Sequence, residues 1–442
     1  MSFRSTSPEP KYPYLVSETH LEGIALNTLS SSTESIHIEK LDNGMAVLVQ
    51  SMPWLRTAAF SLSLRGGVNA EADDDAGLAS MVCEMVQRGA GNYSSRDLVA
   101  IQDNLGMDRS SGVSTSAVSY GGSMPADSLQ AALELYAHIV RRPHLPADQL
   151  DDAKLMAMQE LRAIEDEPTQ RVMIRLREMQ YGKRLGRNSH GTQTSLAKIT
   201  PDHIREFYTS HYHAGGAILA VAGNLDIEEV VGWAKQNFGD WKSGEIAAAA
   251  TFEGAAGQEH IDSPSSQTHI GFSFNGIPFG HTDYFKLRAA IGILSDGMSS
   301  RLFDRVREQR GLCYTITAGC HSLEQLGAVF GYAGTTPERA QQTLDVTLGE
   351  FKKFTEDLRI DELERWKVRI QSNLIMEQES SASRASSIAS DYFQLGRVLT
   401  TAELEQIIES LTLDEVKSYW LDHLPGDFRI VTLGPKKLSA PQ

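Results

Sequence analysis

The chain has 442 residues, of which 41% are hydrophobic and 22% charged, and its formal net charge at pH 7 is −16. This length predicts two domains of roughly 200 residues each. The acidic balance argues against sequence-independent binding to nucleic acid or anionic lipid. No apolar run approaches the roughly 18 residues needed to cross a bilayer, so we expect no membrane span.

Residues 1–35 are rich in Ser, Thr, Pro and Glu and have neither the basic and apolar regions of a signal peptide nor the composition of a transit peptide. They predict a flexible N-terminal arm on a cytoplasmic protein. The three cysteines, Cys83, Cys313 and Cys320, are too few for a disulfide framework and are expected to be reduced.

Hydrophobic periodicity and capping residues predict the elements of the first half. An amphipathic helix is expected over 76–88, because Leu78, Met81, Val82 and Met85 recur at helical spacing. In chain order the patterns predict strands at 36–41, 45–50 and 57–64, helices at 76–88 and about 94–105, a strand at 110–121, helices at 126–141, 146–164, 168–181 and 200–212, and a strand at 217–222.

The second half repeats this order at an offset of roughly 212 residues, which is the mark of a duplicated module. Its expected elements include a strand at 268–274, a helix after Pro337, helices at 361–374 and after 412, and a closing strand at 428–433. We therefore expect an α+β fold of two homologous domains, 36–242 and 259–442, joined by a small-residue linker at 243–258. Each domain should be a mostly antiparallel sheet with helices packed against it.

The order of these segments and three local motifs resemble the pitrilysin, insulysin and mitochondrial processing peptidase family of inverted-motif zinc peptidases, from about His37 to Gly434. The resemblance implies that the two domains form a clamshell half-chamber. Members of this family carry H-x-x-E-H on a helix after a Gly-Leu-Ala turn, where two histidines bind zinc and the glutamate activates water. A distant glutamate is the third ligand.

The zinc motif is degenerate in this chain. Placed on Gly77-Leu78-Ala79, the family pattern requires histidine, glutamate and histidine where this sequence has Ser80, Cys83 and Glu84. Only Glu160, before Glu165-Asp166-Glu167-Pro168, matches the third ligand position. We expect no catalytic residue and no metal in this chain.

Two further segments match positions that contact substrate in the family. The segment 299–314 places Arg307 and Tyr314 where the family has an arginine and a tyrosine that reach towards bound peptide. Both side chains are hydrogen-bond donors suited to a peptide carbonyl or an oxyanion. The segment 105–113 lies where the family has an exposed edge strand that pairs with extended peptide, so Met107, Asp108, Arg109, Ser110 and Ser111 are candidate peptide contacts.

The leading hypothesis is a non-catalytic subunit of a two-chain zinc peptidase, which needs a partner with the intact motif to contribute to proteolysis. Zinc would then belong to the partner, and the chain would form a heterodimer with it, or a homodimer when alone. One alternative is a structural or peptide-binding scaffold like the core subunits of respiratory complexes. Another is a self-sufficient peptidase that binds metal through Cys83, Glu84 and Glu160.

Overall fold

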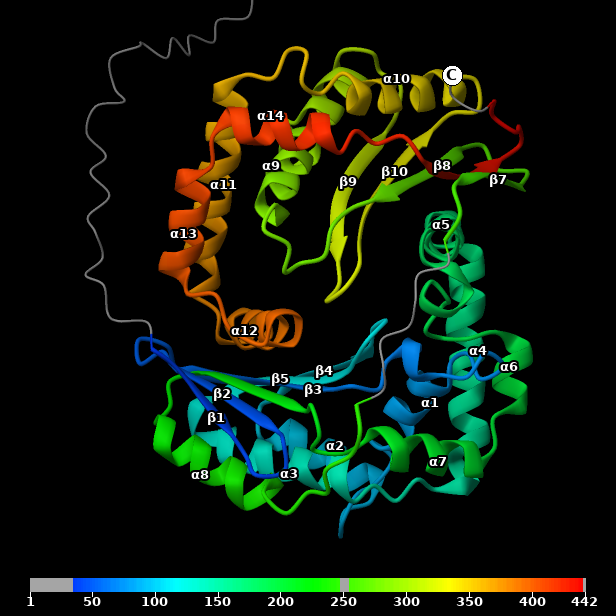
Figure 1. Cartoon of the computed structure of the whole chain (residues 1–442). Helices are drawn as coiled ribbons and strands as arrows, with labels where there is room; N and C mark the ends of the chain where they lie inside the picture. Colours follow the sequence, from blue (N-terminus) through cyan, green and yellow to red (C-terminus); the bar gives the residue numbers. More distant parts are fainter. Residues whose placement is uncertain (1–34, 247–253, 440–442) are drawn as a thin grey trace, which may run out of the picture. The chain divides into compact units, whose positions relative to one another are not determined.

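The structure is a computed structural model that describes residues 35–246 and 254–439. The predicted N-terminal arm, except for residue 35, and the middle of the predicted linker lie outside these described residues. The described part contains two sheets, each surrounded by helices (Figure 1). The α+β class predicted from the sequence is confirmed.

The first sheet has the strand order β1-β2-β6-β3-β5-β4. All neighbours are antiparallel except β2 and β6, which run parallel. Gly44 allows the tight turn between β1 and β2 because its backbone adopts φ of 90°. The strands are β1 Ile36–Lys40, β2 Ala46–Ser51, β3 Thr57–Leu64, β4 Asp108–Val113, β5 Val118–Pro125 and β6 Ile218–Gly223.

The second sheet repeats the first without a counterpart of β1, in the order β7-β11-β8-β10-β9. Its single parallel pair, β7 with β11, corresponds to β2 with β6. The strands are β7 Gly257–Asp262, β8 Thr268–Asn275, β9 Thr315–Ser322, β10 Gly327–Thr335 and β11 Arg429–Gly434. The duplication inferred from the sequence is therefore visible in the strand order.

Several helices begin where the sequence places capping residues. The side chains of Ser94, Thr200 and Thr412 accept hydrogen bonds from backbone N–H groups in the first turns of α2, α7 and α14. The helices are α1 Leu78–Met85, α2 Ser95–Asn104, α3 Leu129–Arg141, α4 Leu150–Asp166, α5 Pro168–Leu185, α6 Gln193–Lys198, α7 Pro201–His211, α8 Ile227–Phe238, α9 Tyr284–Ser295, a π-helix Phe303–Glu308, α10 Ala340–Lys352, α11 Ile360–Glu377, α12 Ser381–Leu395, α13 Thr401–Ser410 and α14 Leu413–Asp422.

One helix from each half of the chain packs on the sheet of the other half. Helix α12, from the second half, packs on β3 and β6 of the first sheet, where Ile388 and Phe393 join an apolar cluster with Leu48 (Figure 1). Helix α5, from the first half, packs on β8 and β11 of the second sheet through Val172 and Leu176. Because α5 and α12 occupy equivalent places in the two repeats, the exchange is reciprocal.

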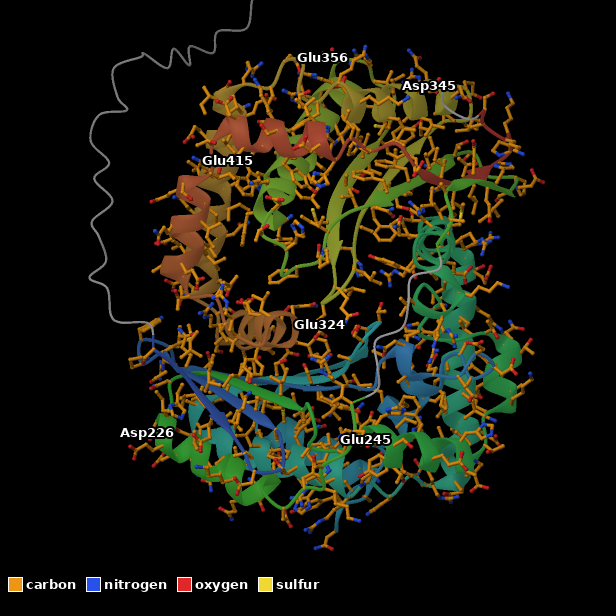
Figure 2. All side chains as sticks on the ribbon, viewed as in Figure 1. Asp226, Glu245, Glu324, Asp345, Glu356 and Glu415 are labelled. Atoms are coloured by element: carbon orange, nitrogen blue, oxygen red, sulfur yellow. The ribbon has the colours of Figure 1, made fainter. Side chains whose placement is uncertain are left out.

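A salt bridge adds a polar contact between the halves. Arg65, just after β3, lies 2.9 Å from the carboxylate of Glu324 at the β9–β10 turn, which Figure 2 labels. The guanidinium also lies 4.3 Å from the ring centre of Phe393 on α12. Arg65 thus contacts two separate parts of the second half.

One predicted element is wrong. The single strand expected at 110–121 is a hairpin of β4 and β5, whose strands pair from Asp108 with Ser123 to Val113 with Val118. The turn at 114–117 is Ser-Thr-Ser-Ala, which lacks the strong turn residues Gly, Pro, Asn and Asp and has only the weaker signal of serine and threonine. The polar, alternating residues of 110–121 therefore showed the pattern of one continuous strand.

Candidate functional site

Helix α1 is held in place at its first turn. The fully buried carboxylate of Glu71 accepts hydrogen bonds from the backbone N–H groups of Gly77, at 3.1 Å, and Ala79, at 2.9 Å. Gly77 itself has φ of 90°, and a β-carbon there would come within 2.9 Å of the His190 carbonyl oxygen. The predicted apolar stripe of the helix is buried in the core of the first half.

The four degenerate zinc positions lie together. Ser80, Cys83 and Glu84 of α1 and Glu160 of α4 line one pocket. The hydroxyl of Ser80 donates a 2.7 Å hydrogen bond to the carbonyl of Ser189. The structure thus places these four residues around one pocket.

Both glutamates of this pocket already have charged or chargeable partners. Glu84 forms an ion pair at 3.0 Å with Arg88, which follows the end of α1. Glu160 lies 3.0 Å from the Nδ1 atom of His190, which also lines the pocket. His190 was missed by the sequence analysis because the stretch 188–191 has no periodic pattern and no motif of its own.

Cys83 occupies the position of the family's catalytic glutamate and is buried. Burial raises the pKa of its thiol to about 11, while hydrogen bonds with Tyr120 and Ser111 act in the opposite direction. The thiol is therefore uncharged near neutral pH. It cannot replace the carboxylate that activates water in the family, because a neutral thiol is not a general base.

These residues do not match a zinc site. Structural and catalytic zinc sites use three or four converging nitrogen, sulfur or carboxylate ligands. In residues 35–246 and 254–439, no three His, Cys, Asp or Glu side chains are grouped so that they could hold a metal ion.

The edge strand β4 adjoins the same pocket. Gln87, in the turn just after α1, donates hydrogen bonds to the Cys83 carbonyl at 2.9 Å and to the hydroxyl of Ser111 at 3.2 Å. Ser111, Gly112 and Val113 of β4 line the pocket. The strand is paired on one side with β5 and is the last strand of its sheet within the described residues.

The five candidate residues around β4 differ in exposure. Asp108, Arg109, Ser110 and Ser111 are exposed, whereas Met107 is buried in the core of the first half. Arg109 donates a hydrogen bond to the side chain of Gln102. The backbone edge and the side chains of 108–111 are thus the accessible part of this segment.

Arg307 and Tyr314 lie in the second half and do not line the pocket around α1. Arg307 belongs to the π-helix, a rare conformation that is frequent at functional sites. Its guanidinium lies 4.4 Å from the ring centre of Phe303 and 3.7 Å from the carboxylate of Glu308. Tyr314 is 59% exposed, a high value for a tyrosine next to a strand.

The fold and this pocket define a class of protein: a two-domain zinc-peptidase fold whose ligand positions hold other residues. Family models agree. The model described as "Insulinase (Peptidase family M16)" matches residues 46–193, and that described as "Peptidase M16 inactive domain" matches residues 198–369. The chain belongs to this family, peptidase family M16.

Similar proteins span nearly the whole chain. An uncharacterized zinc protease of Rickettsia felis is 25% identical over 385 residues, covering 87% of this chain and 93% of that protein. The uncharacterized zinc protease YmxG of Bacillus subtilis is 24% identical, covering 89% of this chain and 97% of that protein. These are relatives by sequence.

Solved structures share the fold. An M16 inactive-domain protein from Pseudomonas fluorescens has a TM-score of 0.85 at 22% identity, covering 92% of this chain and 99% of that one. A chain of complex III2 from Candida albicans has a TM-score of 0.79 at 16% identity, covering 91% and 96% respectively. At these identities the likeness concerns the fold alone. No helix in the described residues is long and apolar enough to span a membrane.

Proposed function

We propose that this chain is a non-catalytic subunit that binds peptide beside a zinc peptidase of the same family. One contrast carries the proposal. Ser80, Glu84 and Glu160, at zinc-ligand positions, each have a hydrogen-bond or ion-pair partner at 2.7–3.0 Å. Of the two residues that match substrate-contact positions, Tyr314 is 59% exposed, and the ion pair of Arg307 with Glu308 is longer, at 3.7 Å. Loss of all function would not explain why Arg307 and Tyr314 are still present and accessible.

The surroundings of Arg307 support a role in peptide binding. Phe303 covers one face of the guanidinium, and in the described residues the group makes no hydrogen bond. Its N–H donors are therefore available for a peptide carbonyl, and such bonds strengthen as negative charge develops on the oxygen. The phenol of Tyr314 offers a second donor.

The edge of β4 supports the proposal that the chain binds peptide. An extended peptide added to β4 would form main-chain hydrogen bonds and pass the pocket, because Ser111 belongs to both. Main-chain pairing tolerates many sequences. The expected substrates are therefore unfolded peptides.

The test mixes the full chain with the zinc peptidase that co-purifies with it and follows cleavage of a fluorogenic peptide library. We expect the mixture to cleave faster than the partner alone. Arg307→Ala should remove most of the gain, and Tyr314→Phe should reduce it. Arg310→Ala is the matched control, because Arg310 lies on the same segment and is exposed but matches no contact position.

Other outcomes would identify the alternatives. If the wild-type chain never raises cleavage by any co-purifying peptidase, the proposal is wrong and a scaffold is favoured. Zinc content tests the self-sufficient peptidase. Near-stoichiometric zinc that disappears in Glu160→Gln would show that Cys83, Glu84 and Glu160 bind metal, contrary to our expectation.

A further inference from the structure

A second pocket occupies the corresponding place in the second half. The first pocket lies between α1 and α4, and the second lies between α9 and α11, which are their counterparts in the repeat. The loop Asp296–Ser300 closes one side of it. Neither Arg307 nor Tyr314 lines this second pocket, whereas Ser299 and Ser300, at the start of their segment, do.

Two buried polar side chains line this pocket without a hydrogen-bond partner. Trp366 of α11 is 3% exposed and Ser300 is 5% exposed. In the described residues neither the indole Nε1 nor the hydroxyl Oγ has a partner. An unsatisfied buried polar group costs roughly 1–3 kcal/mol. Two such groups in one pocket are therefore expected to serve a ligand.

Glycine makes room for the indole. A β-carbon on Gly292 of α9 would lie 2.1 Å from the Nε1 atom of Trp366. Any other residue at this position would therefore displace the indole. The edge of the indole that carries Cδ1 and Nε1 thus packs against Gly292, which also lines the pocket. The Oδ2 atom of Asp296 would lie 3.0 Å from the same β-carbon.

Arg369 brings a positive charge to the same loop. Its Nη1 atom would be 2.1 Å from a β-carbon on Gly297, whose φ of 95° also favours glycine. In the described residues Arg369 has no ion pair, whereas Arg365, one turn earlier on α11, is paired with Asp361.

The two acidic side chains of the pocket also differ in whether they have an ion-pair partner. Glu362 is neutralised by Arg301, whose Nη2 atom lies 2.6 Å from it. Asp296 has no ion pair in the described residues and contributes one negative charge. This charge would repel a dianion such as phosphate more strongly than a single carboxylate.

The rim of the pocket is apolar and exposed. Met298 is 78% exposed and Val368 is 61% exposed, and both line the pocket. They give the polar pocket an apolar edge. A ligand that places an apolar group on this rim would remove both from water.

We propose that this pocket binds a single carboxylate flanked by a large apolar side chain, as at the C-terminus of a peptide ending in leucine. The indole N–H, the Ser300 hydroxyl and the Arg369 guanidinium are the three donors for the carboxylate oxygens. Met298 and Val368 cover the apolar side chain. The same chemistry is offered by an aspartate or glutamate side chain beside a leucine. The proposal does not depend on the role of the first pocket or on a peptidase partner.

The test uses the full chain with 15N-labelled tryptophan, and Trp366→Phe assigns the Trp366 indole resonance. The probes are acetyl-Gly-Leu with a free carboxylate, its amide, acetyl-Leu-Asp-amide and acetate. We expect the free acid to shift the resonance downfield and the amide to leave it unchanged. A shift with acetyl-Leu-Asp-amide would show that a side-chain carboxylate is also accepted, while acetate should bind far more weakly because it lacks the apolar group.

Variants separate the donors from the fold. Arg369→Gln and Ser300→Ala should each weaken binding of acetyl-Gly-Leu, by at least about tenfold for the charged donor. Arg162→Gln removes an exposed arginine from α4 and should leave binding unchanged. The proposal is overturned if no probe moves the Trp366 resonance, if the amide binds as well as the acid, or if Arg369→Gln binds like the wild type.

Discussion

The carboxylate of Glu71 accepts a 2.9 Å hydrogen bond from the backbone N–H of Ala79, one residue before the first degenerate zinc position. Glu71 is fully buried and lies 3.6 Å from the guanidinium of Arg187. This contact fixes the start of α1 and hence the side chains that face the pocket. Glu71 is therefore a positioning residue for the whole helix.

Replacing Glu71 with alanine should destabilise the protein by about 2–3 kcal/mol, because two backbone N–H groups lose their acceptor and the buried Arg187 loses one of its two ion pairs in the described residues. Urea unfolding followed by circular dichroism measures this loss as a lower midpoint. Glu228→Ala is a control, because Glu228 is an exposed glutamate in the first turn of α8. An unchanged midpoint would mean that solvent replaces the contact.

The pH dependence of stability should reveal Glu71. Burial raises the pKa of its carboxyl to about 7 from an ordinary value of 4.5, so the folded state binds the proton more tightly. The stabilisation is complete below pH 4.5 and is lost as the pH rises towards 7, at up to about 1.4 kcal/mol per pH unit. Glu71→Gln removes this loss, so its stability relative to the wild type should rise between pH 4.5 and 7.

His321 should have the opposite effect in nearly the same range. Burial lowers the pKa of its imidazole to about 4, and the ring lies 2.6 Å from the hydroxyl of Tyr181 on α5. The unfolded state binds more protons below pH 6.5, so this contribution to stability is present above 6.5 and is lost as the pH falls towards 4. The His321→Gln variant should therefore lose less stability than the wild type as the pH falls from 6.5 towards 4. Urea unfolding at several pH values measures this. If the stability of His321→Gln depended on pH as that of the wild type does, the loss would not come from His321.

The first pocket should regain metal when its ligands are restored. Ser80→His, Cys83→Glu and Glu84→His together recreate H-x-x-E-H on α1, with Glu160 as the third ligand on α4. We expect near-stoichiometric zinc in the purified triple variant, measured by mass spectrometry, and a clear loss of it on adding Glu160→Gln. A folded triple variant without zinc would show that the backbone around α1 has also departed from the peptidase geometry.

The exchanged helix α12 should be essential to stability. Arg384 of α12 is buried and donates a 2.6 Å hydrogen bond to Gln50 of β2, and it pairs with Glu377 at 3.1 Å. Arg384→Met should cost about 3 kcal/mol, because Glu377 loses its ion pair in a largely buried setting. Arg397→Met, which breaks an exposed pair with Glu403, should cost under about 1 kcal/mol. Equal shifts in the urea midpoint would contradict this account.

Much of the fold could be predicted from local patterns. The apolar run 217–222 predicted a buried strand, and β6 is buried along its whole length. The pattern could not show that α12 covers one face of β6, because that helix lies more than 150 residues further along the chain. Local periodicity reports that a face is buried and carries no information on its distant partner.

Only part of the candidate site could be predicted from the sequence. The motif positions placed Ser80, Cys83, Glu84 and Glu160 in one pocket, because the resemblance extended over the whole fold. The contact of Glu160 with His190 could not be read from the sequence, since His190 lies in an irregular turn. The pocket at Trp366 was also missed, because an unsatisfied indole N–H is visible only when its neighbours are placed.

The reciprocal exchange of α5 and α12 has a consequence for synthesis of the chain. Strand β6 completes the first sheet at Gly223, yet α12 begins only at Ser381. About 160 further residues must be translated between them, which takes on the order of ten to thirty seconds at roughly 5–20 residues per second. During that time the apolar face formed by Leu48, Ile218 and Ala220 has no helix to cover it. The nascent chain is then expected to be a client of ribosome-associated chaperones.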